Sequence, residues 1–141
     1  MEKYVSLAGR ILISIVFLLS GFLKITNWHQ TASMLAAIKI PLVAFALPVT
    51  VLVEFGGALC LLAGYRTRAA ALLLFLYLIP VTFMIHNFWA YQGTQQQDQM
   101  GHFLKNVGIM GGLLVLTANG AGKLSVDGSR RTEAFASATP R

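Results

Sequence analysis

The feature that most constrains this chain is an apolar run over residues 40–64, in which Glu54 is the only charged residue. About 20 apolar residues suffice to cross a bilayer as an α-helix, because each adds about 1.5 Å of rise. Glu54 would then lie roughly ten residues from either membrane surface, near the middle of the hydrocarbon. A bare charge at that depth is costly, so we expect Glu54 to face other helices, to have a partner or to bind a proton.

The composition also indicates a membrane protein. Hydrophobic residues make up 56% of the 141 residues and charged residues 11%, with a mean hydropathy of +0.67. Soluble domains carry about 25% charged residues, and a chain of this length could not bury so much apolar surface by itself. The net charge of +6 would suggest nucleic-acid binding in a soluble protein. Here the basic residues flank apolar runs instead, so we expect no nucleic-acid partner.

The apolar segments predict an all-α integral membrane protein with a four-helix transmembrane bundle over residues 1–128. The predicted helices cover about residues 4–24, 41–63, 69–88 and 103–119. We expect a surface loop at residues 25–39 and a polar segment outside the membrane at residues 92–101. Beyond Gly122 the chain is rich in small and polar residues and is expected to be disordered, and residues 129–141 are assigned to a disordered cytoplasmic tail.

The basic residues predict the orientation of the bundle. Three of them fall on one side of the predicted membrane, namely Lys24, Lys39 and Lys105. Eight fall on the other side, namely Lys3, Arg10, Arg66, Arg68, Lys123, Arg130, Arg131 and Arg141. By the positive-inside rule, both termini and the turn between the second and third spans are predicted to be cytoplasmic.

Residue spacing predicts which helix faces are internal. On the first span, five residues at helical steps share one face, and four of them are small or polar: Arg10, Ser14, Phe17, Gly21 and Lys24. On the second span, the corresponding face carries Thr50, Glu54, Gly57, Ala58 and Leu61. In the fourth span, Gly108 and Gly112 predict a surface of small residues against which another helix packs. The single cysteine, Cys60, is interpreted as a small buried hydrophobe.

Two polar groups emerge from this topology. Arg10 and Glu54 are predicted to form a buried polar core, as a structural ion pair or around a functional carboxylate that binds a proton or a ligand headgroup. Near the outer surface, a candidate ligand mouth is formed by Lys24, His86, Lys105 and Asn106, with His102 at the same level. An interfacial lysine such as Lys24 can also simply extend to the membrane surface.

No spacing of residues indicates a metal centre. Axial haem ligation needs opposed imidazoles, and both His86 and His102 are marginal to the predicted helices. We therefore expect no intrinsic metal or haem, and a quinone as the cofactor that fits a redox function.

Several short motifs occur in a series that resembles the DoxX family. The resemblance spans roughly residues 6–128 and rests on Gly9–Leu12, Ser20–Lys24, Glu54–Gly57, Gly64–Ala70, His86, Phe103–Asn106, Gly111–Gly112 and Gly120–Asp127. It implies a bacterial four-helix, multi-pass inner-membrane protein. The family is named for a small subunit of a thiosulfate:quinone oxidoreductase or terminal quinol oxidase complex, and other members resemble membrane partners in redox-stress assemblies. The family's recurrent polar positions match Arg10, Lys24, Glu54, His86, Lys105 and Asn106, but no catalytic role transfers with them.

The sequence therefore predicts a membrane subunit of a quinone-linked oxidoreductase or redox-stress complex, without its own metal centre. Its expected partners are the lipid bilayer, oxidoreductase subunits and further copies of the chain. One alternative is a small proton-coupled transporter that uses Glu54, because one membrane glutamate in a four-span chain also suits proton exchange. Another is a purely structural membrane subunit, in which Glu54 would matter only for stability.

Overall fold

The computed structural model describes residues 1–130, which are helical apart from short connections and contain no strand. In chain order the elements are α1 (Glu2–Thr26), α2 (Trp28–Ala37), α3 (Val43–Ala63), α4 (Thr67–Ile85), the 3₁₀ turn η1 (Phe88–Ala90) and α5 (Gly93–Asn119). Within this part of the chain, four segments are long and apolar enough to cross a membrane: α1, α3, α4 with η1, and α5. The predicted all-α, four-span fold is confirmed.

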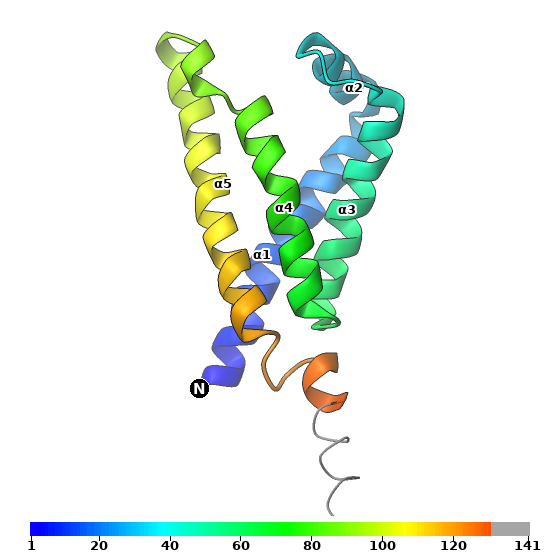
Figure 1. Ribbon diagram of the computed structural model, residues 1–141, viewed down its shortest axis with the longest axis vertical. Helices are drawn as coiled ribbons and strands as arrows, with labels where there is room; N and C mark the ends of the chain where they lie inside the picture. The colour runs from blue at the N-terminus through cyan, green and yellow to red at the C-terminus, as the bar shows by residue number, and fades with distance from the viewer. Residues whose placement is uncertain (131–141) are drawn as a thin grey trace, which may run out of the picture.

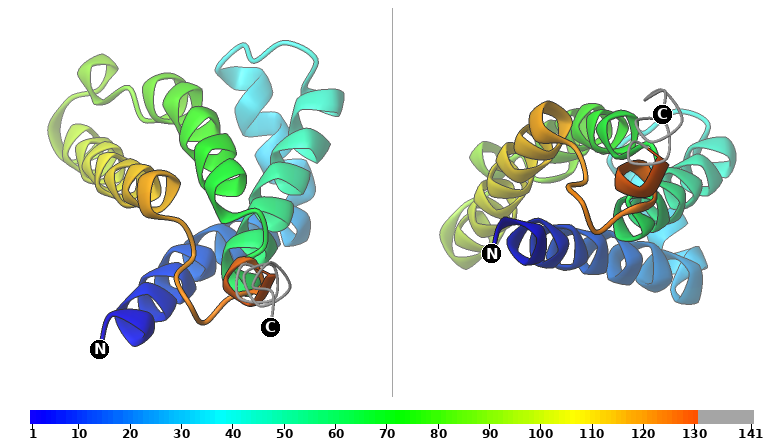
Figure 2. Two further views of the ribbon diagram at one scale, coloured as in Figure 1. Left: turned by 60° about the horizontal axis from the view of Figure 1, so that its bottom comes forward. Right: turned by 90° about the horizontal axis from the view of Figure 1, so that it is seen from below.

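The four long helices form two pairs that converge at one end of the bundle. α1 packs along α3, α4 packs along α5, and contacts between α3 and α4 join the two pairs. The pairs converge at the end where the N-terminus and the segment after α5 lie, and they diverge toward α2 and η1 (Figure 1). Seen from the convergent end, α1 runs along one side, and α4 and α5 curve around the other (Figure 2).

The core lies where the predicted internal faces meet. On α1 the buried residues are Arg10, Ser14, Phe17 and Gly21, and on α3 they are Leu47, Glu54, Gly57, Ala58 and Leu61. Gly57 is needed for close packing, because a Cβ there would lie 2.7 Å from Leu74 of α4. Most large apolar side chains on the opposite faces are exposed, as expected of surfaces that contact lipid. The predicted faces are thus confirmed over most of their length.

Two predicted details differ in the structure. Residues 28–37 form α2 where we expected a loop, since this stretch is rich in good helix formers and buries Leu35 against the bundle. Helix α5 begins at Gly93, earlier than the predicted start at residue 103, because a polar sequence can continue a helix beyond the apolar span. The change from apolar to polar residues therefore indicates the edge of the membrane-spanning part, and the helix itself can extend beyond that edge.

The predicted glycine packing surface on α5 is confirmed only in part. A Cβ on Gly112 would lie 3.0 Å from Ile13 of α1, so this glycine lies at a helix contact. A Cβ on Gly108 would meet nothing within 4 Å. Gly108 is therefore wrong as an internal packing position, because it is exposed on the surface of α5.

The segment after α5 folds back onto the convergent end, so the expectation of disorder beyond Gly122 is wrong for residues 123–130. The guanidinium of Arg10 donates hydrogen bonds to the carbonyls of Leu61 and Leu62, at 2.9 and 3.1 Å, and to that of Leu124. The first two carbonyls belong to the last turn of α3, where the regular helical donors end, and that of Leu61 also accepts the N–H of the C-cap Gly64 at 3.1 Å. Arg10 therefore caps α3 and ties it to the C-terminal segment. Residues 131–141, most of the predicted tail, lie outside the described part.

Asp127 of the same segment caps the next helix. Its carboxylate accepts hydrogen bonds from the backbone N–H groups of Arg66 and Thr67, both at 2.9 Å, at the start of α4. Its own N–H donates to the carbonyl of Gly64 at 2.9 Å. Partial burial would raise the pKa of Asp127, but the two backbone hydrogen bonds and the nearby charge of Arg130 outweigh it and lower the pKa.

We expect Gly64→Ala to destabilise the bundle by at least about 2 kcal/mol. Gly64 has a φ of +68°, and a Cβ there would lie 2.3 Å from Ser125 Cβ and 2.6 Å from Arg10 Nη1. The matched control is Gly108→Ala, which has open space and should be neutral or gain up to about 1 kcal/mol of helix propensity. Thermal unfolding in detergent measures both, and equal melting temperatures for the two variants would contradict this packing.

We expect Asp127→Asn to cost about 1 kcal/mol at neutral pH, as for a lost helix cap. Because folding lowers the pKa of Asp127, the carboxylate contributes stability above its unfolded pKa and loses that contribution as the pH falls through the folded pKa. The difference between wild type and variant should therefore shrink below about pH 4. Unfolding measured between pH 3 and 7 tests this, and a difference that does not change with pH would contradict the cap.

Candidate functional site

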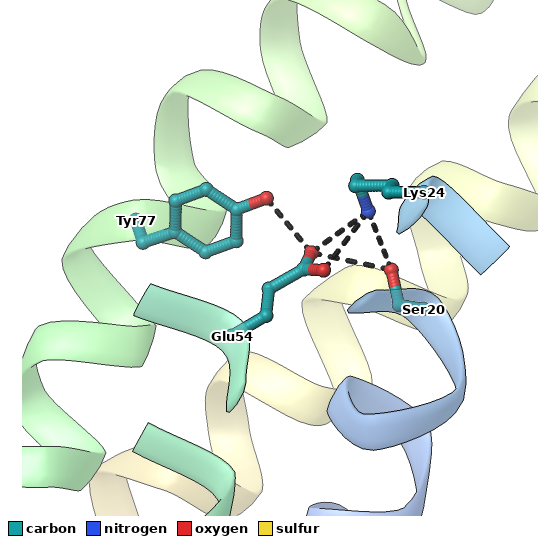
Figure 3. Close-up of polar contacts among 4 residues, drawn as sticks. All are labelled: Ser20, Lys24, Glu54 and Tyr77. Carbon is teal, nitrogen blue, oxygen red and sulfur yellow. Dashed lines mark hydrogen bonds and ion pairs between the residues drawn. The ribbon is translucent and has the colours of Figure 1, made fainter. Parts of the chain in front are cut away.

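The polar cluster inside the membrane is centred on Glu54 of α3 (Figure 3). Lys24 Nζ of α1 lies 2.9 and 3.0 Å from the two carboxylate oxygens. Tyr77 of α4 donates its hydroxyl to Oε1 at 2.8 Å. Ser20, one turn before Lys24, accepts a hydrogen bond from the ammonium at 2.6 Å and donates to Oε1 at 3.2 Å. One carboxylate thus links three membrane-spanning helices.

The carboxylate is shielded and the ammonium is partly open. The side chain of Glu54 is 4% exposed, whereas that of Lys24 is 22% exposed. The Lys24–Glu54 ion pair is the only one within residues 1–130. In surroundings of low dielectric, a lone buried charge is strongly disfavoured, and the pair is held by additional hydrogen bonds to both partners.

A glycine permits this close approach of α1 and α3. A Cβ on Gly21 would lie 2.7 Å from the ring of Phe55 and 3.6 Å from Glu54 Oε2. A larger residue at this position would push the two helices apart at the level of the ion pair. Small residues at such crossings let transmembrane backbones come close enough for polar side chains to pair.

The structure corrects the expected partner of Glu54. The predicted Arg10–Glu54 pair is wrong, because the guanidinium of Arg10 donates to carbonyls at the end of α3. Both residues are buried, but Arg10 lies at the convergent end, and Glu54 pairs with Lys24. Arginine has a planar fork of donors that suits several carbonyls at a helix end, whereas lysine acts as a compact charge. Charge and depth alone do not distinguish these two roles.

A second polar cluster lies between α4 with its C-cap and α5. His86 Nδ1 lies 2.9 Å from Gln99 Oε1, and its ring stacks on His102 with the ring centroids 5.0 Å apart. Lys105 Nζ lies 3.2 Å from His102 Nδ1. These contacts hold two histidine rings stacked on each other at the divergent end of the bundle. Directly stacked rings leave no room for the macrocycle that separates the opposed imidazoles of an axial haem pair.

The predicted ligand mouth is therefore divided between two clusters. Lys24 belongs to the Glu54 cluster, while His86 and Lys105 contact His102. Asn106 is buried one turn deeper and donates to Thr82 Oγ1 at 3.1 Å. Within the described residues, no three His, Cys, Asp or Glu side chains are grouped so that they could hold a metal ion.

Sequence reasoning missed four of the residues in these clusters, namely Ser20, Tyr77, Thr82 and Gln99. Ser20 is four residues before Lys24, so helical spacing alone could have placed it beside the ammonium. Thr82 lies four residues after the buried Leu78 and shares its internal face. Tyr77 gave no comparable signal, because it lies at the edge of that face and only its hydroxyl reaches Glu54.

The family profile that matches this chain is DoxX, over residues 5–87. The chain belongs to the DoxX family. The matched region contains every residue of the Glu54 cluster, whereas α5 lies beyond it. No solved structure gave a significant match.

Several curated proteins are related to this DoxX-family chain. It is 36% identical to the Escherichia coli inner membrane protein YqjF, with 86% of this chain and 88% of that protein covered. It is 30% identical to the E. coli inner membrane protein YphA, with 86% of each chain covered. It is also 32% identical to the Saccharomyces cerevisiae ER-derived vesicles protein ERV29. That alignment covers 92% of this chain but only 35% of the yeast protein. The two E. coli relatives are inner-membrane proteins, and this chain has four helices that can span a membrane. Together these findings identify a multi-pass inner-membrane protein.

We expect removal of either charge of the ion pair to cost about 3 kcal/mol, because the remaining charge stays buried without a partner. The variants are Glu54→Gln and Lys24→Met. The double variant should be less destabilised than the sum of the two, since it leaves no bare charge. A double-mutant cycle of unfolding in detergent measures the coupling. Additive effects would mean that the two groups do not interact in the membrane.

Proposed function

We propose that this DoxX-family protein is a membrane subunit of a quinone-linked oxidoreductase assembly, in which the Glu54 cluster binds the quinone headgroup and exchanges its protons. The observation that carries the proposal is the Lys24–Glu54–Tyr77 cluster itself. It places a proton acceptor and two hydrogen-bond donors inside the membrane. The family resemblance supports the quinone link. Ionisable groups within transmembrane segments are commonly functional.

The donor set fits a quinone chemically. A quinone headgroup is apolar except for its carbonyl oxygens, which accept hydrogen bonds. Lys24 has three N–H donors, of which two contact Glu54 and one contacts Ser20. Redirecting one of these bonds to a ligand carbonyl would leave the ion pair in place. The exposed fraction of Lys24 gives the ligand access to the ammonium from outside the core.

Each residue has a distinct role in the proposal. When bound, a quinone supplies two-electron, two-proton chemistry, and its electrons are exchanged with a redox centre in a partner subunit. Glu54 accepts or returns a proton at its carboxylate, and Lys24 stabilises the ionised form. Tyr77 orients the carboxylate, while the apolar residues around it exclude water. His86 and Lys105, at the divergent end, provide polar groups between this cluster and the membrane surface.

We expect the purified protein to bind a short-chain ubiquinone analogue in detergent, with Lys24→Met weakening the affinity at least tenfold. Tyr77→Phe removes only the hydroxyl and should weaken it about fivefold, as for one lost hydrogen bond. The control is Tyr4→Phe, a tyrosine exposed near the N-terminus, which should bind like the wild type. Calorimetric titration measures all four proteins. No binding by the wild type, or equal binding by the Lys24 variant, would refute the quinone site.

Proton-coupled transport is a second candidate, favoured by the way that Glu54 joins α1, α3 and α4. Protonation of this carboxylate would weaken its contacts to two neighbouring helices together, and this would couple a proton to a change in helix packing. Proton flux across liposomes, driven by an added cationic substrate, separates the two candidates. Flux that disappears in Glu54→Gln but persists in Glu2→Gln would favour transport over quinone binding.

A further inference from the structure

A cavity of about 810 Å³ lies at the convergent end of the bundle, away from the Glu54 cluster. It lies between the start of α4 and the segment that follows α5, and its lining includes Arg66, Arg68, Asn119 and Lys123. The α3–α4 turn and the returning C-terminal segment meet at this end (Figure 2). The cavity therefore lies where two membrane spans end, at the level of lipid headgroups.

The cavity has an excess of positive charge. Within residues 1–130, the charged groups of Arg66, Arg68 and Lys123 form no ion pair. The carboxylate of Asp127 also lines the cavity, but its two oxygens accept the backbone N–H groups of Arg66 and Thr67. Three cations and one engaged anion leave a net positive charge, so the cavity favours an anionic ligand.

An apolar groove of about 380 Å³ adjoins this cavity on the lipid-facing side of α3 and α4. Arg66 and Ala69 line both spaces, so the groove leads directly to the cations. Along the groove lie Leu52, Gly56 and Leu73. A Cβ on Gly56 would meet nothing within 4 Å, so this glycine leaves the surface hollow without serving a helix contact.

We propose that the cavity and the groove together bind one anionic phospholipid of the surrounding bilayer. Arg66, Arg68 and Lys123 hold the phosphate group, and one acyl chain lies in the groove past Gly56. A basic cavity alone would suit any phosphate-containing anion, and an apolar groove alone would suit any lipid. Their junction at Arg66, at the end of two spans, matches a molecule that carries both a phosphate and an acyl chain.

The first experiment tests recognition of the anionic headgroup by native mass spectrometry of the protein in detergent micelles. Phosphatidylglycerol and phosphatidylcholine with the same oleoyl chains are added at equal concentrations. We expect preferential retention of phosphatidylglycerol, and a loss of roughly 30-fold in that preference in Arg68→Gln/Lys123→Gln. The control is Lys3→Gln/Lys39→Gln, which removes the same charge from outside the cavity and should keep the preference.

A second experiment tests the acyl-chain groove by filling it with the substitution Gly56→Leu. This variant should bind phosphatidylglycerol at least fivefold more weakly without losing thermal stability. The control is Gly108→Leu, a helical glycine that also has open space around it but lies on α5, and it should bind like the wild type. Melting curves without added lipid verify that all variants are folded.

Three results would overturn the proposal. Equal retention of the two lipids by the wild type would exclude recognition of the anionic headgroup. An unchanged preference in Arg68→Gln/Lys123→Gln would place any lipid elsewhere. Displacement of phosphatidylglycerol by equimolar glycerol phosphate would show a site for soluble anions, in which the acyl groove has no part.

Discussion

The structure depends above all on the ion pair between Lys24 and Glu54 within the membrane. Because hydrocarbon offers no solvent to a charge, each partner must be supplied by another part of the bundle, and this fixes the rotation of α1 and α3 about their axes. Gly21 lets the two helices approach, and Tyr77 extends the same interaction to α4. The two charged groups that are most costly to place in hydrocarbon thus determine which helix faces are internal.

A second set of polar contacts secures the convergent end by a different principle. There the groups to be satisfied are backbone ones: Arg10 caps carbonyls at the end of α3, and Asp127 caps amides at the start of α4. Arg10 also donates to the carbonyl of Leu124, so the segment after α5 takes part in both caps and closes the α3–α4 hairpin. The helix pairs are fixed at this end and diverge at the other, where the histidine cluster lies (Figure 1).

The bundle thus has two different polar sites at different heights, the Glu54 cluster and the basic cavity at the convergent end. The Glu54 cluster combines a shielded carboxylate with a partly exposed ammonium, and the proposed proton exchange with a ligand depends on this combination. The basic cavity at the convergent end has cations that form no ion pair within residues 1–130, which is the basis of the proposed anion site there. The proposals for the two sites are independent, because they share no residue and are tested by different ligands.

The sequence by itself determined the membrane environment, the four spans and most of the internal faces of α1 and α3, because hydrophobic length and helical spacing are local properties. It also singled out Glu54 as a residue that needs a partner. Only the tertiary structure decided that this partner is Lys24, that Arg10 caps a helix, and that Tyr77 joins the cluster. These choices depend on the relative height and rotation of neighbouring helices, which follow from how small residues such as Gly21 and Gly57 let helices approach. The identity of a side chain determines whether it needs a partner, and the packing between distant segments determines which residue that partner is.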